Sequence, residues 1–276
     1  MRKRFPVHGW FGALVTGIFW WVNWGLTGER THWAFFPLWL GYILAVDGLS
    51  VVRGRPSLVR QGWRFVLLFI LSAPVWWIFE LINRRLDYWR YEPAGFLPPG
   101  EYYFWSTLCF STVIPAIFVT ANFLASVPWF RRHHLRLRAG KTATGRIIYF
   151  VLGCAMLIAV LIWPAYGMAL LWMALFFILD PINHWLGRPS LLRNTAGGDW
   201  RPVLLLFAAA LTCGFFWEMW NYWSWPRWVY TFPFLDWLPV FEMPILGYLG
   251  YLPFGLEVYA FVALLGSTVV KSVFDR

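Results

Sequence analysis

The sequence has little charge and few cysteines. Only 13% of its 276 residues are charged, which is about half the share found in soluble proteins. Three cysteines, Cys109, Cys154 and Cys213, all lie in apolar stretches and form no Cys-x-x-Cys motif. They therefore read as small core residues without disulfide or metal roles, and we expect no metal site.

Signatures of cofactor chemistry are missing as well. No two of the five histidines face each other from the middle of apolar stretches, which argues against a haem held between helices. The sequence has no P-loop, no His-Glu-x-x-His and no Gly-x-Ser-x-Gly motif. We expect no cofactor.

Apolar residues dominate the chain. They make up 60% of it, with 22 Trp and 26 Phe, and apolar runs long enough to cross a bilayer recur along the whole sequence. Unbroken runs of this length indicate helices rather than barrel strands. We predict an all-α polytopic membrane helix bundle with about eight transmembrane helices, at roughly 10–26, 33–52, 64–83, 104–127, 147–165, 167–185, 202–221 and 244–269.

The net charge is +10, and the basic residues are distributed unevenly between the two predicted sides of the membrane. With the N-terminus inside, the inner loops and both termini hold 18 Lys and Arg, and the outer loops hold 5. This bias predicts a bacterial inner-membrane protein with both termini cytoplasmic. Because topology explains the basic residues, no nucleic-acid partner is expected.

One pattern occurs twice, over 47–91 and over 180–230. Each copy opens with an aspartate, followed by Gly-Arg-Pro-Ser-Leu, a Glu with an Asn three residues later, and Trp-x-Tyr. We interpret this as two copies of one unit. An even number of helices in each copy predicts two parallel four-helix repeats, over 1–130 and 147–276, joined by a basic cytoplasmic linker over 131–146.

The two aspartates have a structural interpretation. Asp47 and Asp180 can each bond to the turn that follows, with Arg55 or Arg188 as counter-ion. The serine of each turn is placed to cap the next helix.

The two repeated glutamates are the main functional candidates. Glu80 and Glu218 share a helix face with Asn83 and Asn221, because residues at i and i+3 are neighbours on a helix. Two interpretations stay open. One is a hydrogen-bond clamp between helices, and the other is a polar site in a shared cavity where a carboxyl acts as an acid.

The two segments over 84–103 and 222–243 are rich in aromatic residues and proline. They are expected to form either an aromatic belt at the membrane surface or a lid over a site. The candidates for substrate binding, in and near these segments, are Asn83, Asn221, Trp89, Tyr91, Trp228, Tyr230 and, in a helix expected to be kinked, Glu257.

The first copy carries Glu80 on a helix, then Trp89-Arg90-Tyr91, then PPGEYYFW at 98–105. In this order it resembles the small membrane-embedded lycopene cyclase domains of carotenoid biosynthesis. Those domains carry an acid on a helix, then Trp-x-Phe/Tyr, then a Pro–acid–acid–aromatic motif, and they also occur as duplicated units.

The second copy has the same order, with Glu218, Trp228-Val229-Tyr230 and LPVFE at 238–242. Where the family has paired acids this chain has a single Glu101 or Glu242, and its unit has four helices rather than three. The resemblance implies acid-catalysed rearrangement of an isoprenoid, with Glu80, Glu218, Glu101 and Glu242 as candidate catalytic residues.

Three functions remain open from the sequence. The first is an intramembrane isoprenoid cyclase, isomerase or lipid-binding protein, whose partner is a membrane lipid or isoprenoid. The second is a non-catalytic subunit or scaffold that packs against protein partners in the membrane. The third is a small-solute transporter, which the scarcity of polar residues along the helices disfavours.

Overall fold

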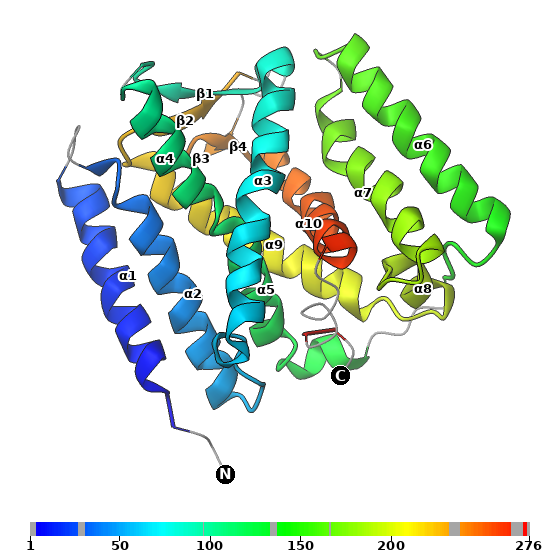
Figure 1. Cartoon of the computed structure of the whole chain (residues 1–276), viewed down its shortest axis with the longest axis horizontal. Coiled ribbons are helices and arrows are strands. Elements are labelled where there is room, and N and C mark those ends of the chain that lie inside the picture. The colour runs from blue at the N-terminus through cyan, green and yellow to red at the C-terminus, as the bar shows by residue number, and fades with distance from the viewer. Residues whose placement is uncertain are drawn as a thin grey trace.

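A computed structural model describes residues 4–26, 31–95, 97–132, 137–165, 167–231, 238–265 and 273–274. The chain is a helical bundle (Figure 1). Its helices are α1 (Val7–Gly25), α2 (Phe35–Val52), α3 (Trp63–Leu86), α4 (Pro99–Phe110), α5 (Val113–Leu124), α6 (Ala143–Ile162), α7 (Met168–Trp185), α8 (Leu191–Ala196), α9 (Arg201–Tyr222) and α10 (Tyr251–Leu265). Short 3-10 helices η2 (Val59–Gln61), η3 (Pro128–Arg132) and η4 (Ile245–Gly250) lie between them.

Each of the eight expected apolar segments contains a helix, and the all-α class is confirmed. Among the described residues, six helical stretches are long and apolar enough to span a membrane: Phe35–Val52, Trp63–Leu86, Pro99–Leu124, Ala143–Ile162, Arg201–Tyr222 and Ile245–Leu265. The apolar part of α7 is shorter, and α1 lies outside this set. The chain is thus a helical membrane protein, and six of the eight expected spans meet this length and hydropathy in the described part of the chain.

The fourth predicted helix is broken between α4 and α5. Pro115 has no N–H to offer the carbonyl four residues earlier and its ring clashes with it, which interrupts a helix at this point. Ser72 of α3 satisfies the groups at the break. Its hydroxyl donates to the carbonyl of Phe110 at 2.5 Å and accepts from the backbone N–H of Ile114 at 3.0 Å.

Two helix pairs flank a central group. In Figure 1, α1 and α2 lie at one side and α6 and α7 at the other, with α3, α5, α9 and α10 between them. Small residues let α1 and α2 approach closely. A Cβ on Gly12 would lie 2.5 Å from the backbone nitrogen of Ala45, and one on Gly41 would lie 2.6 Å from that of Thr16.

Aromatic rings fill much of the core. Trp39 of α2 is fully buried, and its ring centroid lies 5.0 Å from those of Tyr42, Trp217 and Trp220. These contacts join α2 to α9 across the middle of the bundle. They fix the wall of the candidate site described below.

A two-stranded ribbon joins the two aromatic segments. Strand β1 (Trp89–Glu92) pairs antiparallel with β2 (Arg227–Tyr230), with Trp89 opposite Tyr230 and Tyr91 opposite Trp228. Each Trp of one Trp-x-Tyr motif therefore faces the Tyr of the other. A second, shorter pair is formed by β3 (Pro239–Val240) and β4 (Met243–Pro244).

Candidate functional site

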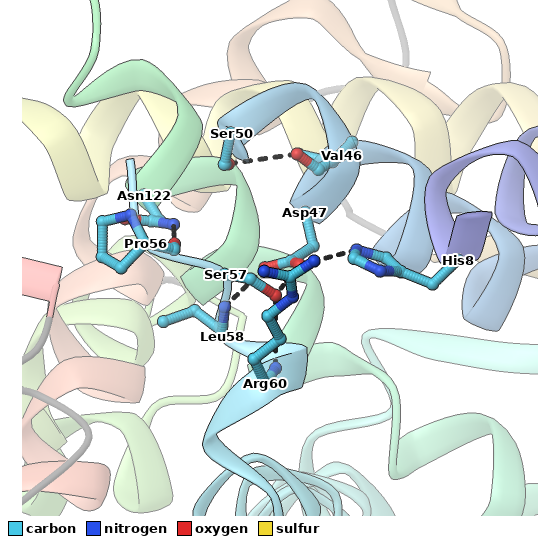
Figure 2. Close-up of polar contacts among 9 residues, drawn as sticks. All are labelled: His8, Val46, Asp47, Ser50, Pro56, Ser57, Leu58, Arg60 and Asn122. Carbon is cyan, nitrogen blue, oxygen red and sulfur yellow. Dashed lines mark hydrogen bonds and ion pairs between the residues drawn. The ribbon is translucent and has the colours of Figure 1, made fainter. Parts of the chain in front are cut away.

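The Asp47 carboxylate organises the turn between α2 and α3 (Figure 2). It is fully buried and accepts from the backbone N–H of Leu58 at 2.6 Å and from the Ser57 hydroxyl at 2.5 Å. Its Oδ2 also lies 3.0 Å from Nε2 of His8 on α1. The Ser57 oxygen in turn accepts from the backbone N–H of Arg60 at 3.2 Å. This arrangement anchors α1, α2 and the turn that leads to α3.

Asp180 holds the equivalent turn after α7. It accepts from the backbone N–H groups of Leu191 and Leu192, both at 2.8 Å, and from the Ser190 hydroxyl at 3.1 Å. Ser190 is the residue that caps α8. Ser190 thus has the predicted capping role, at α8. The prediction was wrong for Ser57, because α3 begins after Gly62 without a side-chain cap and Ser57 instead braces the turn through the N–H of Arg60.

The two arginines of these turns lie apart from the aspartates' hydrogen bonds. Arg55 donates from Nε to the Asn122 side chain at 3.2 Å and from Nη2 to the carbonyl of Val273 at 3.0 Å. The side chain of Arg188 is exposed. In the described ranges, the ion-pair partner of Asp47 is His8, which the sequence pattern did not single out.

Glu80 accepts three hydrogen bonds at one carboxylate oxygen. The donors are the indole N–H groups of Trp76 at 3.2 Å and Trp89 at 3.1 Å, and the hydroxyl of Tyr91 at 2.7 Å. Glu80 is only 9% exposed. The carboxylate therefore ties α3 to the ribbon and orients the Tyr91 phenol.

The two asparagines hold the backbone of the ribbon. Asn83 donates to the carbonyl of Trp89 at 2.7 Å and accepts from the N–H of Tyr88 at 2.8 Å. Asn221 donates to the carbonyl of Trp228 at 2.7 Å and accepts from its N–H at 2.8 Å. The spacing of Glu and Asn thus places the carboxylate against a side chain of the strand and the amide against its main chain.

Glu218 differs from Glu80 in its partners. Its Oε1 accepts from the hydroxyls of Tyr230 at 2.6 Å and Tyr251 at 2.5 Å. The indole of Trp228 donates to the Tyr230 oxygen at 3.0 Å. Glu218 is fully buried, and its second oxygen has no hydrogen-bond partner within the described ranges. The two halves of the site are therefore chemically unequal.

The phenols of the ribbon stay protonated over a wide pH range. Burial, followed by the adjacent carboxylates of Glu80 and Glu218, raises the pKa values of Tyr91 and Tyr230 well above their usual range. Each hydroxyl therefore remains a donor to its glutamate.

A cavity of about 150 Å³ lies between the two glutamate clusters. We call it the aromatic cavity. Its wall includes Trp76, Trp89, Tyr91, Trp172, Trp217, Trp228, Tyr230, Tyr251 and Phe254, contributed by α3, α7, α9, α10 and the ribbon. Glu80 and Glu218 are not part of the wall, because the rings that they hold stand in front of them. The site is an apolar chamber with oriented phenols at its edge.

The other predicted acids lie away from this wall. Glu101 is exposed in the first turn of α4, and Glu242 pairs with Arg227 at 2.6 Å. Glu257 is fully buried in α10, where it accepts from the backbone N–H of Leu175 at 3.2 Å. None of the three lines the aromatic cavity.

Several residues of the wall were missed by reasoning from the sequence. Tyr251 donates to Glu218 but belongs to no repeated motif, and Trp172 lies in a long apolar run. Because 22% of the chain is aromatic, no single ring stands out in the sequence. Within the described ranges, no three His, Cys, Asp or Glu side chains gather as they would around a metal ion.

Comparisons with protein-family models, with curated proteins and with solved structures find no match for this chain.

Proposed function

We propose that the protein binds the end of an isoprenoid, or of a comparable apolar lipid, in the aromatic cavity. The observation that carries this proposal is a chamber walled by aromatic rings whose phenols are held by buried carboxylates. Ligand pockets in proteins are mainly apolar, with a few fixed polar groups that orient the ligand. The aromatic cavity has this character.

The size of the cavity limits what enters it. Cavities of about this volume hold a benzene-sized molecule, whereas whole drug-sized ligands need about 300 Å³ or more. We infer that one end of a longer hydrocarbon occupies the chamber and that the remainder extends into the bilayer. The repeated Trp-x-Tyr motifs would contact this end, with Asn83 and Asn221 acting as positioning residues.

A second candidate is acid-catalysed isoprenoid rearrangement, as the resemblance to lycopene cyclase domains implies. The observation that favours it is the placement of the Tyr91 and Tyr230 phenols between the glutamates and the cavity. This step requires the glutamate in its neutral acid form. The acid would give its proton to the phenol oxygen as the phenol proton passes to a ligand double bond, which leaves a carboxylate and a ligand cation; proton loss from that cation back through the phenol would restore the acid. The aromatic wall would stabilise the resulting cation. In this candidate, Glu101 and Glu242 have no role at the cavity.

We also propose that the two halves are parallel four-helix repeats. The support is that each Asp, Asn and Tyr of the repeated pattern makes the same kind of contact in both halves. The inner-membrane location with both termini cytoplasmic remains part of this proposal, supported by the distribution of basic residues.

The test is native mass spectrometry of the gently solubilised protein, followed by solvent extraction of what stays bound. A stoichiometric isoprenoid or a single lipid species is the expected result. The variant Ser106→Phe fills the cavity, because Ser106 lines it, and should lose the ligand. Ala155→Phe places the same side chain on the exposed face of α6 and should retain it.

Bulk phospholipid alone, together with other protein chains in a fixed ratio, would refute ligand binding and favour the scaffold function. For the catalytic candidate, the extracted ligand is incubated with the protein and the products are analysed. Turnover retained in both Glu80→Gln and Glu218→Gln would rule out the acid role.

A further inference from the structure

A second pocket adjoins the aromatic cavity. We call it the charged pocket. It is an open hollow of about 630 Å³, and its wall includes Arg90, Glu92 and Arg227. Tyr91, Ser224 and Trp225 line both spaces. The two pockets are therefore immediate neighbours, and the ribbon separates them.

The ribbon is two-faced because side chains alternate along a strand. Trp89, Tyr91, Trp228 and Tyr230 belong to one alternating set and line the aromatic cavity. Arg90, Glu92 and Arg227 belong to the other set, with Glu92 directly opposite Arg227. The strand register thus places a row of charges behind the aromatic wall.

The arginines of this row are held in place yet keep spare donors. A terminal nitrogen of Arg90 lies 3.1 Å from Glu92, and one of Arg227 lies 2.6 Å from Glu242. A guanidinium group has five N–H donors, so each of these ion pairs leaves most of them available. Their side chains are 63% and 40% exposed, which leaves both accessible to a ligand.

We propose that the ligand is an amphiphile whose apolar end occupies the aromatic cavity and whose phosphate ester binds Arg90 and Arg227 in the charged pocket. This inference rests on the proposed function and names the ligand class more closely. Guanidinium groups suit phosphate because their fork of donors matches two of its oxygens. The phosphate comes either from an isoprenoid phosphate or from a glycerophospholipid head group.

The test compares ligands that share one hydrocarbon chain. Geranylgeranyl phosphate and geranylgeraniol are titrated into the protein in neutral detergent at low salt, and tryptophan fluorescence reports binding. We expect the phosphate to bind about tenfold more tightly, a modest factor because exposed charges interact weakly. Dioleoyl phosphatidate, titrated in parallel, separates the two sources: tight binding there assigns the phosphate to a lipid head group.

Two double variants make the test specific. Arg90→Gln with Arg227→Gln should bind both ligands equally and should bind the alcohol as the wild type does. Arg84→Gln with Arg85→Gln removes two exposed arginines from the end of α3 and should keep the tenfold preference. If the first variant fails to fold, Arg90→Lys with Arg227→Lys keeps the charge and should lose most of the preference.

Failure of this inference differs from failure of the proposed function. Equal binding of phosphate and alcohol by the wild type would overturn the phosphate site and leave the cavity proposal standing. If the Arg84/Arg85 variant loses the preference for phosphate as fully as the Arg90/Arg227 variant does, the phosphate site is overturned too. The preference would then come from the overall positive charge of this region and not from a site. Failure of all three ligands to bind would overturn the proposed function itself.

Discussion

The contrast between the two glutamates gives a quantitative prediction. Tyr251→Phe removes one of the two donors to the buried Glu218, whereas Tyr91→Phe leaves Glu80 with two indole donors. A hydrogen bond to a charged group contributes about 1.5–3 kcal/mol. We expect Tyr251→Phe to lower the free energy of unfolding by about 2 kcal/mol and Tyr91→Phe by about 1 kcal/mol.

The double variant Tyr230→Phe with Tyr251→Phe gives the sharper test. It leaves the Glu218 carboxyl with neither phenol donor, so the loss should exceed the sum of the single losses by about 1 kcal/mol or more. Equilibrium unfolding from bicelles into denaturing detergent measures these differences. Additive single losses, or equal losses for Tyr91→Phe and Tyr251→Phe, would refute the inequality of the two clusters.

Three further predictions concern the scaffold and its pH response. Asp47→Asn should lower the unfolding free energy by about 2–3 kcal/mol, because the new amide N–H₂ faces donors where the carboxylate had accepted. An unchanged unfolding free energy in this variant would contradict the anchoring role of Asp47. Ser72→Ala should lower the unfolding free energy by about 2 kcal/mol, because it leaves a buried carbonyl and N–H at the α4–α5 break without partners. Backbone hydrogen exchange should become faster at this break before it does elsewhere. Above about pH 10 the unfolded state ionises its tyrosines while the folded state keeps Tyr230 protonated. Stability should therefore fall as pH rises past 10, and less steeply in Tyr230→Phe; unfolding measured at pH 9 and pH 11 checks both.

The apolar runs were enough to predict the helices, because a bilayer leaves the backbone few alternatives. The break between α4 and α5 was harder to foresee. Pro115 marks it in the sequence, but a proline is often accommodated within a membrane helix. The break depends on Ser72, which lies on another helix and supplies both a donor and an acceptor.

The repeated motif identified half of the site and gave little indication of the rest. Glu80 and Tyr91 lie eleven positions apart and meet because a short turn folds the ribbon back on α3. Tyr251 reaches Glu218 from a different helix and belongs to no repeat. Contacts within one copy are local and leave a spacing in the sequence, whereas contacts between helices depend on packing that no spacing encodes.

Glu80 and Glu218 occupy equivalent positions of the repeated pattern but have different hydrogen-bond partners. Glu80 has three donors on one oxygen and serves as a clamp. Glu218 has two phenol donors and an oxygen that no described group satisfies. Tyr230 and Tyr251, the two donors to Glu218, both line the aromatic cavity, and with fewer donors Glu218 is the weaker of the two clamps. Loss of ligand in Ser106→Phe should therefore destabilise the Glu218 cluster more than the Glu80 cluster. In that variant, faster backbone hydrogen exchange at β2 than at β1 would support this prediction. Equal exchange in both strands would refute it.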